Sequence, residues 1–194
     1  MENRDEIIGW RIMTRLVIAV SGTPGTGKSM FARALARKLD ARLVDLNAMI
    51  KRKKLFKLDV DGTRIANLRG MRAEFSRIIR DSSDPIVVEG LLAHLLPTKY
   101  LTHVVVLRTK PKVLEKRLRA RKYSGAKLQD NLEAEALSII LWEAVREHGL
   151  TKVYEIDTTE MKVKTAVGLF LKALAGKTSL RPGKIDWLEE FYGV

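Results

Sequence analysis

Eight consecutive residues near the start of the chain have the types and spacing of a phosphate-binding loop (P-loop). They fit the pattern G-x-x-x-x-G-K-[ST], directly after a short apolar run and directly before a helical pattern. Glycines let the backbone turn successive N–H groups inward, and a helix N-terminus adds positive partial charge, so such a loop can surround phosphate oxygens. The eight residues are Gly22, Thr23, Pro24, Gly25, Thr26, Gly27, Lys28 and Ser29.

The last two residues of this loop, Lys28 and Ser29, indicate which ligands the loop binds. We expect the Lys28 ammonium to bridge the terminal phosphates of ATP, and the Ser29 hydroxyl to bind Mg²⁺ whose other ligands are waters and phosphate oxygens. The alternative is a glycine-rich turn between a strand and a helix that binds no ligand. Because strand and helix patterns flank the motif, the sequence favours an ATP site.

One acidic residue is predicted to act at the same site. Glu89 ends the third predicted strand, a position from which an acid can bind Mg²⁺ through water or orient a nucleophile. It could instead cap a helix N-terminus or be a surface charge. Ser29 and Glu89 are therefore the expected magnesium site, and Glu89 joins Lys28 among the catalytic candidates.

Phosphoryl transfer needs cations that neutralise the transferring group, so arginines are expected to converge on it. Arg117 and Arg121 are one helical turn apart on one face. Residues 117–128 are therefore predicted to form a small lid that carries two catalytic arginines; the alternative is an ordinary solvated helix face. Arg108, at the carboxyl end of the fourth predicted strand, is a third candidate.

Strand and helix patterns alternate and predict a P-loop NTPase fold, an α/β fold with a five-stranded parallel sheet flanked by helices. The first predicted strand, 16–20, is a β-branched run without polar alternation, as expected when both faces are buried. The other predicted strands are 41–45, 86–89, 103–107 and 153–156. The helices follow a 3.6-residue period: 28–40, a stripe from Ile65 to Ile79, 111–118, a long helix over about 128–147, and 161–175. At 194 residues, one domain over 1–194 is expected.

The amino-acid composition indicates which kinds of partner the protein could bind and in which cellular compartment it is expected. The 36 Lys and Arg residues against 23 Asp and Glu give a formal charge of +13, which favours polyanionic partners such as nucleotides or RNA, or else a well-solvated surface. The absence of cysteine excludes disulfides and thiolate metal sites and indicates an intracellular protein. No apolar run reaches about 18 residues, so we expect a soluble, cytoplasmic protein with no membrane partner.

Several blocks of sequence resemble the atypical adenylate kinases of archaea and eukaryotic nuclei, a family linked to small-ribosomal-subunit maturation that includes a coilin-interacting nuclear ATPase. These blocks are Gly22–Ser29, Val106–Thr109, Arg117–Tyr123 and Lys127–Asn131, and the resemblance spans roughly residues 16–174. It implies an adenylate-kinase-like fold that binds ATP, ADP and AMP with Mg²⁺. It also implies a small-subunit ribosomal protein and ribosomal RNA as partners.

The resemblance also divides the chain. It implies a short acceptor-binding insertion at 45–80, a lid at 117–128, and a loop on the adenine side at Asp157 and Thr158. Residues 1–14 are left as an N-terminal extension without assigned function, and residues 176–194 as a C-terminal appendage. The aromatic residues of this appendage either dock a partner or cover an edge of the same domain, and the second interpretation is favoured.

One position departs from the family pattern. The family's third-strand motif runs acid, one residue, then His, and this pair is tied to hydrolysis and Mg²⁺. Here Leu91 stands at the usual His position, and His94 follows three residues on. His94 either substitutes for the missing His or is a packed polar residue, and we favour packing. The departure weakens the case for ATPase chemistry.

Two functions of different classes follow. The first is an adenylate kinase that transfers the γ-phosphoryl group of Mg-ATP to AMP, with ATPase activity as a side reaction and a role in small-subunit maturation. The second is an assembly ATPase whose main partner is a ribosomal protein or RNA, which the basic run Lys51–Lys54 would serve. A kinase for another small acceptor stays open. We expect a monomer or weak oligomer, nuclear only if the source is eukaryotic.

Overall fold

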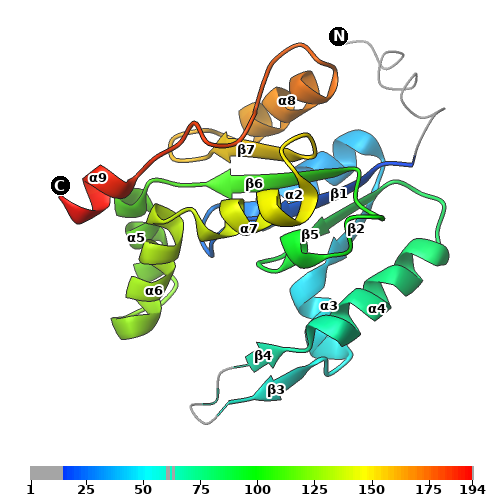
Figure 1. Ribbon diagram of the computed structural model, residues 1–194, viewed down its shortest axis with the longest axis horizontal. Helices are drawn as coiled ribbons and strands as arrows, with labels where there is room; N and C mark the ends of the chain where they lie inside the picture. The colour runs from blue at the N-terminus through cyan, green and yellow to red at the C-terminus, as the bar shows by residue number, and fades with distance from the viewer. Residues whose placement is uncertain (1–14, 60–61, 63, 194) are drawn as a thin grey trace.

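A five-stranded sheet forms the centre of the molecule, with the strand order β2-β5-β1-β6-β7 and every neighbouring pair parallel (Figure 1). The computed structural model describes residues 15–59, 62 and 64–193, so the interpretation of 1–14 as an extension lies outside the described residues. The predicted α/β sheet is confirmed, and the predicted strands differ from the observed ones only at their ends. The strands are β1 (Val17–Ser21), β2 (Arg42–Asp45), β5 (Ile86–Glu89), β6 (His103–Arg108) and β7 (Val153–Asp157).

Helices cover both faces of the sheet. One face packs against α2 (Lys28–Leu39) and α8 (Val163–Leu174). The other packs against α3 (Leu46–Arg52), α4 (Leu68–Arg80), η2 (Ala93–Leu95) and α7 (Ile139–His148). Because both faces are covered, the central strand β1 is buried along its whole length and reads as an apolar run, whereas the edge strand β2 is mostly exposed. Within the described residues, no helix combines the length and apolar character needed to cross a bilayer.

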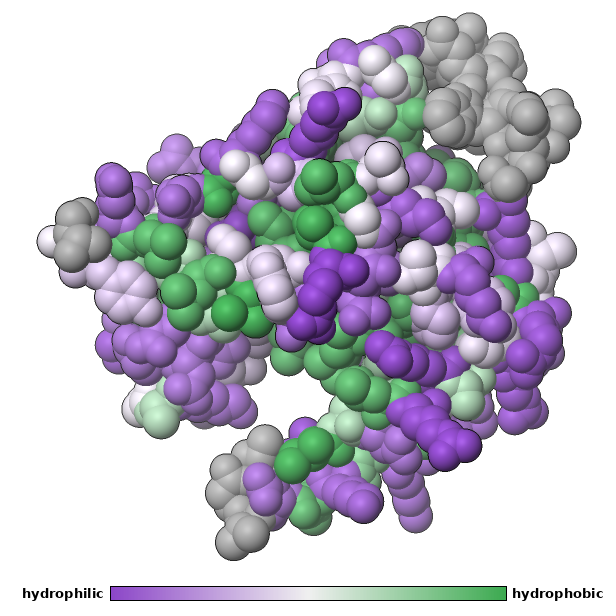
Figure 2. Space-filling view, viewed as in Figure 1, coloured by the Kyte–Doolittle hydropathy of each residue, from purple (hydrophilic) through white to green (hydrophobic). Residues whose placement is uncertain are grey.

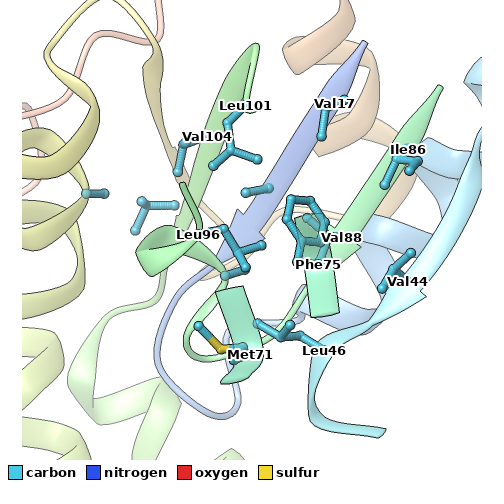
Figure 3. Packing of buried hydrophobic residues seen from close by; sticks show 14 of the residues in the cluster. Val17, Val44, Leu46, Met71, Phe75, Ile86, Val88, Leu96, Leu101 and Val104 are labelled. Carbon is cyan, nitrogen blue, oxygen red and sulfur yellow. The ribbon is translucent and has the colours of Figure 1, made fainter. Parts of the chain in front are cut away.

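The apolar cluster under α4 and α7 is the larger of the two that flank the sheet. It brings Met71 and Phe75 of α4 together with Leu46 and with Val88 of β5 (Figure 3). In β1, Val17 and the other odd-numbered apolar residue belong to this cluster, whereas the even-numbered ones face α2 and α8. This alternation fixes which face of the sheet each helix covers.

A separate helix pair lies beyond the carboxyl end of β6 (Figure 1). It consists of α5 (Pro111–Arg119) and α6 (Gly125–Ala136). The pair has its own small core of buried leucines, which is distinct from the two clusters on the sheet: Leu114, Leu118, Leu128 and Leu132.

The long helix predicted over 128–147 is wrong. The structure has two helices there, because α6 ends at Ala136 and α7 begins at Ile139. Ser138 between them has φ 56° and ψ 29°, a left-handed conformation that no helix interior contains. The apolar period continues across this break, and no glycine or proline marks it, so periodicity alone could not locate it.

Residues 45–80, the expected acceptor-binding insertion, contain α3, α4 and a small antiparallel hairpin that projects from the body (Figure 1). The hairpin pairs β3 (Phe56–Leu58) with β4 (Arg64–Ala66). The prediction that Ile65 belongs to the helical stripe is wrong, since it lies in β4 and is 55% exposed. The helix begins after Asn67, whose side chain accepts a hydrogen bond from the Gly70 N–H at 2.9 Å and so caps it.

The C-terminal residues lie against the edge strand β7 and the α5–α6 pair. The Glu155 N–H donates to the Leu180 carbonyl oxygen at 2.9 Å. A short helix, α9 (Leu188–Tyr192), then places Phe191 against the leucine cluster and Glu190 2.8 Å from the Lys110 ammonium. The appendage therefore packs against the rest of the structure, as the favoured interpretation expected, but of its aromatic residues Tyr192 is 50% exposed and Phe191 contacts the α5–α6 pair and not the sheet edge.

We expect Phe75→Ala to lower the free energy of unfolding by about 3–5 kcal/mol, because Phe75 is fully buried and its loss leaves a cavity. Urea unfolding followed by circular dichroism would measure the change. The control is Leu58→Ala on the hairpin, where a side chain that is 66% exposed should cost no more than about 0.5 kcal/mol. Equal losses in the two variants would contradict this description of the core.

Candidate functional site

The P-loop sequence folds between β1 and α2, in the strand–loop–helix order that the motif predicts. Gly22 has φ 140°, and a Cβ there would lie 2.4 Å from the Leu107 carbonyl oxygen, so glycine is required. Gly27, the N-cap of α2, has φ 92°, and no atom lies within 4 Å of a Cβ built on it. The N-terminus of α2, where unpaired N–H groups favour an anion, is thus accessible.

The Lys28 ammonium folds back over its own loop. Its Nζ donates to the Thr23 carbonyl oxygen at 3.0 Å. Burial lowers the pKa of Lys28 to about 8; the carboxylates of Glu89 and Glu135 oppose this shift, and the Arg121 guanidinium adds to it. Two cations and two acids therefore interact within one small region at the carboxyl end of β1.

Arg108 is not a free cation at this site, which corrects its prediction as a third catalytic arginine. The side chain is 2% exposed, and its Nε and Nη1 donate to Oε1 of Glu135 and to Oε1 of Glu155, each at 2.8 Å. Its Nη2 donates to the main-chain oxygen of Glu135 at 2.8 Å. All three nitrogens are bonded inside the protein, so Arg108 joins β6, α6 and β7 instead of binding a ligand.

Arg117 and Arg121 differ in setting, although both belong to the predicted lid. Arg117 lies within α5 and is fixed: its Nη2 donates to the carbonyl oxygens of Thr158 and Thr159 at 3.1 and 2.8 Å. Its Nη1 lies 3.3 Å from the Gly25 carbonyl oxygen of the P-loop. Arg121 lies after the end of α5, in the turn before α6, and is exposed. Of the two arginines predicted for the lid, Arg117 is therefore anchored by hydrogen bonds, whereas Arg121 is exposed.

The expected adenine-side residues lie where β7 meets the P-loop. Thr158 is buried, and its hydroxyl is 2.9 Å from the Thr26 carbonyl oxygen and 2.8 Å from that of Arg108. The Asp157 carboxylate accepts hydrogen bonds from the N–H and the hydroxyl of Thr159. Thr158 thus ties this loop to the P-loop, and Asp157 lines a hollow of about 410 Å³ with Glu160, Met161, Lys162 and Thr165.

The donors expected to bind Mg²⁺ are one buried carboxylate and one exposed hydroxyl. Glu89 is 6% exposed, which excludes the surface-charge alternative, and it pairs in register with Val20 of β1. Ser29, in the first turn of α2, is exposed. No three His, Cys, Asp or Glu side chains cluster within the part of the chain that the structure describes. Such a donor set fits Mg²⁺, which takes one or two protein oxygens and keeps phosphates and waters for the rest.

Known proteins that resemble this chain show its family. The AAA domain family matches residues 18–138. A protein of Thermococcus onnurineus named "Putative adenylate kinase" is 32% identical over 185 residues, covering 91% of this chain and 93% of its own length. One of the same name from Archaeoglobus fulgidus is 37% identical over 179 residues, covering 90% and 93%. The chain belongs to this archaeal adenylate kinase family.

Solved structures agree with the fold of this family. A shikimate kinase from Bacteroides thetaiotaomicron has a TM-score of 0.60 at 19% identity, covering 82% of this chain and 98% of its own. A gluconokinase from Sinorhizobium meliloti has a TM-score of 0.55 at 19% identity, covering 84% and 94%. At this level of identity the likeness concerns the fold alone, which is that of P-loop kinases.

His94 is a packed polar residue in this member of the adenylate kinase family. It is 1% exposed, with Nδ1 2.9 Å from the Ser21 hydroxyl and Nε2 2.8 Å from Oε2 of Glu143. Burial lowers the pKa of His94, and the hydrogen bond to Glu143 opposes the shift. Leu91, at the position where the family pattern has His, is 37% exposed. The favoured packing interpretation of His94 agrees with these contacts.

Sequence reasoning missed Glu135, the acid that contacts the P-loop. Its Oε2 accepts a hydrogen bond from the Thr23 hydroxyl at 2.5 Å, and both side chains are buried. A signal was present, because Glu135 falls on the same face of α6 as Leu128 and Leu132. A charged residue on the apolar face of a helix implies a buried partner.

We expect the affinity for Mg-ATP to fall as the pH rises through about 8, because Lys28 then loses the proton that makes it a cation. The sign follows from the lowered pKa: the charge is present below this value and lost above it. Isothermal titration with Mg-ATP from below pH 8 to well above it would measure the change. The Lys28→Ala variant should bind weakly throughout and lack the step. A wild-type affinity that stayed constant across this range would contradict the prediction.

Proposed function

We propose that this protein is an adenylate kinase that transfers the γ-phosphoryl group of Mg-ATP to AMP. The observation that carries the proposal is the convergence of Lys28, Glu89 and Arg121 beside an accessible P-loop. Membership of the archaeal family, whose relatives carry the adenylate kinase name, supports the same reaction.

In this proposal the P-loop binds the donor phosphates. Backbone N–H groups of the loop, which Pro24 lacks, surround the phosphate oxygens, and Lys28 leaves the Thr23 carbonyl to bridge the terminal phosphates. Ser29, through its hydroxyl, and Glu89, through its carboxylate, would hold Mg²⁺. When bound, Mg²⁺ would neutralise negative charge on the phosphate groups of ATP as the γ-phosphoryl group is transferred.

The two arginines have different roles in the proposal. Arg117, anchored to carbonyl oxygens of the P-loop and of the β7 loop, forms a fixed wall of the donor site next to Asp157 and Thr158. Arg121 is exposed in the α5–α6 turn and can move toward the transferring phosphoryl group. Charge on that group develops in the transition state, so Arg121 should act mainly on the rate.

The acceptor side is formed by residues 45–80. Figure 2 shows an open notch between the α5–α6 pair and the β3–β4 hairpin. Residues 45–80 also contain exposed cations, among them Lys51, Arg52 and Lys54 of α3 and the turn that follows it, and in this proposal they would attract the phosphate of AMP. Closure of the notch would exclude water and so favour transfer to AMP over hydrolysis.

The deciding experiment measures ADP formation from Mg-ATP with and without AMP, alongside the release of free phosphate. An adenylate kinase should make ADP in AMP-dependent excess over phosphate. Phosphate release that ignores AMP would contradict the proposal and indicate an ATPase. Replacing AMP with other nucleoside monophosphates or small alcohols in the same assay tests whether another acceptor is preferred.

Lys28→Ala should abolish turnover, because it removes the cation from the transferring phosphates. Arg121→Ala should lower kcat by about a hundredfold or more while changing the KM for ATP much less. Arg119→Ala is the matched control: Arg119 is exposed in the last turn of α5 and pairs with Glu115 at 2.7 Å, and its loss should leave kcat near that of the wild type. If Arg119→Ala and Arg121→Ala behave alike, the role given to Arg121 is wrong.

A second candidate is an ATPase that acts in small-subunit assembly on a ribosomal protein or ribosomal RNA. The specific observation in its favour is an exposed apolar patch at the α6–α7 junction, beside a net charge of +13. Its members are Leu137, Ile139 and Trp142, exposed by 46%, 41% and 59%. Phosphate release that such a partner stimulates, and AMP does not, would favour this candidate.

A further inference from the structure

Thr23 forms hydrogen bonds both within the P-loop and to a distant part of the chain. Its carbonyl oxygen accepts hydrogen bonds from the Lys28 ammonium at 3.0 Å and from the Thr26 hydroxyl at 2.9 Å. Its own hydroxyl donates to Oε2 of Glu135, which lies in α6, 112 residues further along the chain. The Thr23 side chain therefore links the peptide that holds Lys28 to a residue outside the loop.

Glu135 is itself held by several donors. Its Oε1 accepts from Nε of Arg108 at 2.8 Å and from the N–H of Thr109 at 3.0 Å, while Oε2 serves Thr23. The side chain is 2% exposed, so its charge is stabilised by these contacts and not by water. A buried carboxylate with both oxygens hydrogen-bonded is held in one orientation. Its hydrogen bond with the Thr23 hydroxyl therefore fixes the position of Thr23.

We propose that Glu135 is a positioning residue for the P-loop: it fixes Thr23, and through the Thr23 carbonyl it sets where Lys28 lies before phosphates bind. The inference rests on the proposed role of Lys28 as the phosphate-binding cation, and it is independent of which acceptor the enzyme uses. Glu135 touches no substrate in this role; it acts through the loop.

The chain offers a matched control in Glu155. Glu155 is equally buried and pairs with the same guanidinium, Nη1 of Arg108, at 2.8 Å. Its second oxygen accepts from the N–H groups of Gly183 and Lys184 at 2.9 and 3.1 Å, on the side of the C-terminal appendage. Glu135→Gln and Glu155→Gln thus each remove one buried charge beside Arg108, and the contact with the P-loop belongs to Glu135.

A glutamine at position 135 should disturb Thr23 in particular. The donors at the Oε1 position, from Arg108 and Thr109, cannot act as acceptors, so the single amide oxygen must stay there. The amide NH₂ then faces Thr23, whose hydroxyl must reverse and accept where it had donated to a charged oxygen. The charge-assisted bond that fixes the loop is lost, while the volume of the side chain is kept.

The experiment compares Mg-ATP affinity, the KM for ATP, kcat and thermal stability in the two variants. We expect Glu135→Gln to weaken Mg-ATP binding and raise the KM for ATP by about tenfold, with a smaller effect on kcat. Glu155→Gln should keep the Mg-ATP affinity and the KM for ATP within about twofold of the wild type, because Glu155 does not contact the loop. Its loss of Tm should be at least as large as that of Glu135→Gln, because both Glu155 oxygens face groups that can only donate. Equal losses of affinity in both variants would overturn the proposal.

A double-mutant cycle tests the route through Thr23. Thr23→Val removes the hydroxyl without removing a buried charge, so it also serves if Glu135→Gln fails to fold. If Glu135 acts through Thr23, the double variant should bind Mg-ATP about as weakly as the weaker single variant. Losses that multiply would show that the two residues act separately and would overturn the proposal.

Hydrogen exchange separates this proposal from the proposed function. We expect the amides of residues 22–29 to exchange faster in Glu135→Gln than in Glu155→Gln, whatever reaction the enzyme performs. If wild-type protein makes no ADP from AMP, the proposed function fails and this comparison still stands. Unchanged exchange of the loop amides in Glu135→Gln would overturn the positioning role even in an active kinase.

Discussion

The arrangement of the site depends on one buried guanidinium. Arg108 is almost fully enclosed, and burial of a charge costs several kcal/mol unless its donors are all bonded. The carboxylates of Glu135 and Glu155 and a main-chain oxygen satisfy its three nitrogens. Because Arg108 lies in β6 and its partners lie in α6 and β7, the charge is tolerated only when these three elements meet. Glu135 also contacts Thr23 of the P-loop, so its pairing with Arg108 helps to place the floor of the site.

This constraint divides the molecule into a fixed part and an adjustable part. Thr158 joins the β7 loop to the P-loop, and Arg117 joins both to α5, so these segments cannot move independently. The α5–α6 pair, whose connecting turn contains the exposed Arg121, and the β3–β4 hairpin border the notch on its two sides (Figure 2). Any closure around substrates would therefore be expected from these two edges, with the P-loop as the stationary reference.

The parts of the fold that sequence predicts well are those whose physical cause is local. A strand that is buried on both faces, such as β1, is an uninterrupted apolar run, and all five strands of the sheet were predicted to within a residue or so at their ends. The P-loop motif likewise has its strand and helix on either side. The sequence did not predict the helix break at Ser138 or the place of Ile65 in a strand. The first depends on the backbone conformation of Ser138 and the second on the helix cap at Asn67, and neither changes the apolar period. Glu135 and Arg108 are 27 residues apart, and no spacing rule connects them.

A spacing of four residues does not by itself place two side chains on the same face of a helix. Arg117 and Arg121 would share a face only if the helix continued through both, yet α5 ends at Arg119. The first arginine is consequently bound to three carbonyl oxygens, and the second is left in the turn near Lys28. Burial lowers the pKa of Lys28 and Arg121 lowers it further, whereas the acids Glu89 and Glu135 oppose the shift. Phosphates entering the loop would add negative charge beside Lys28 and Arg121, so donor binding and the approach of the exposed arginine should favour each other.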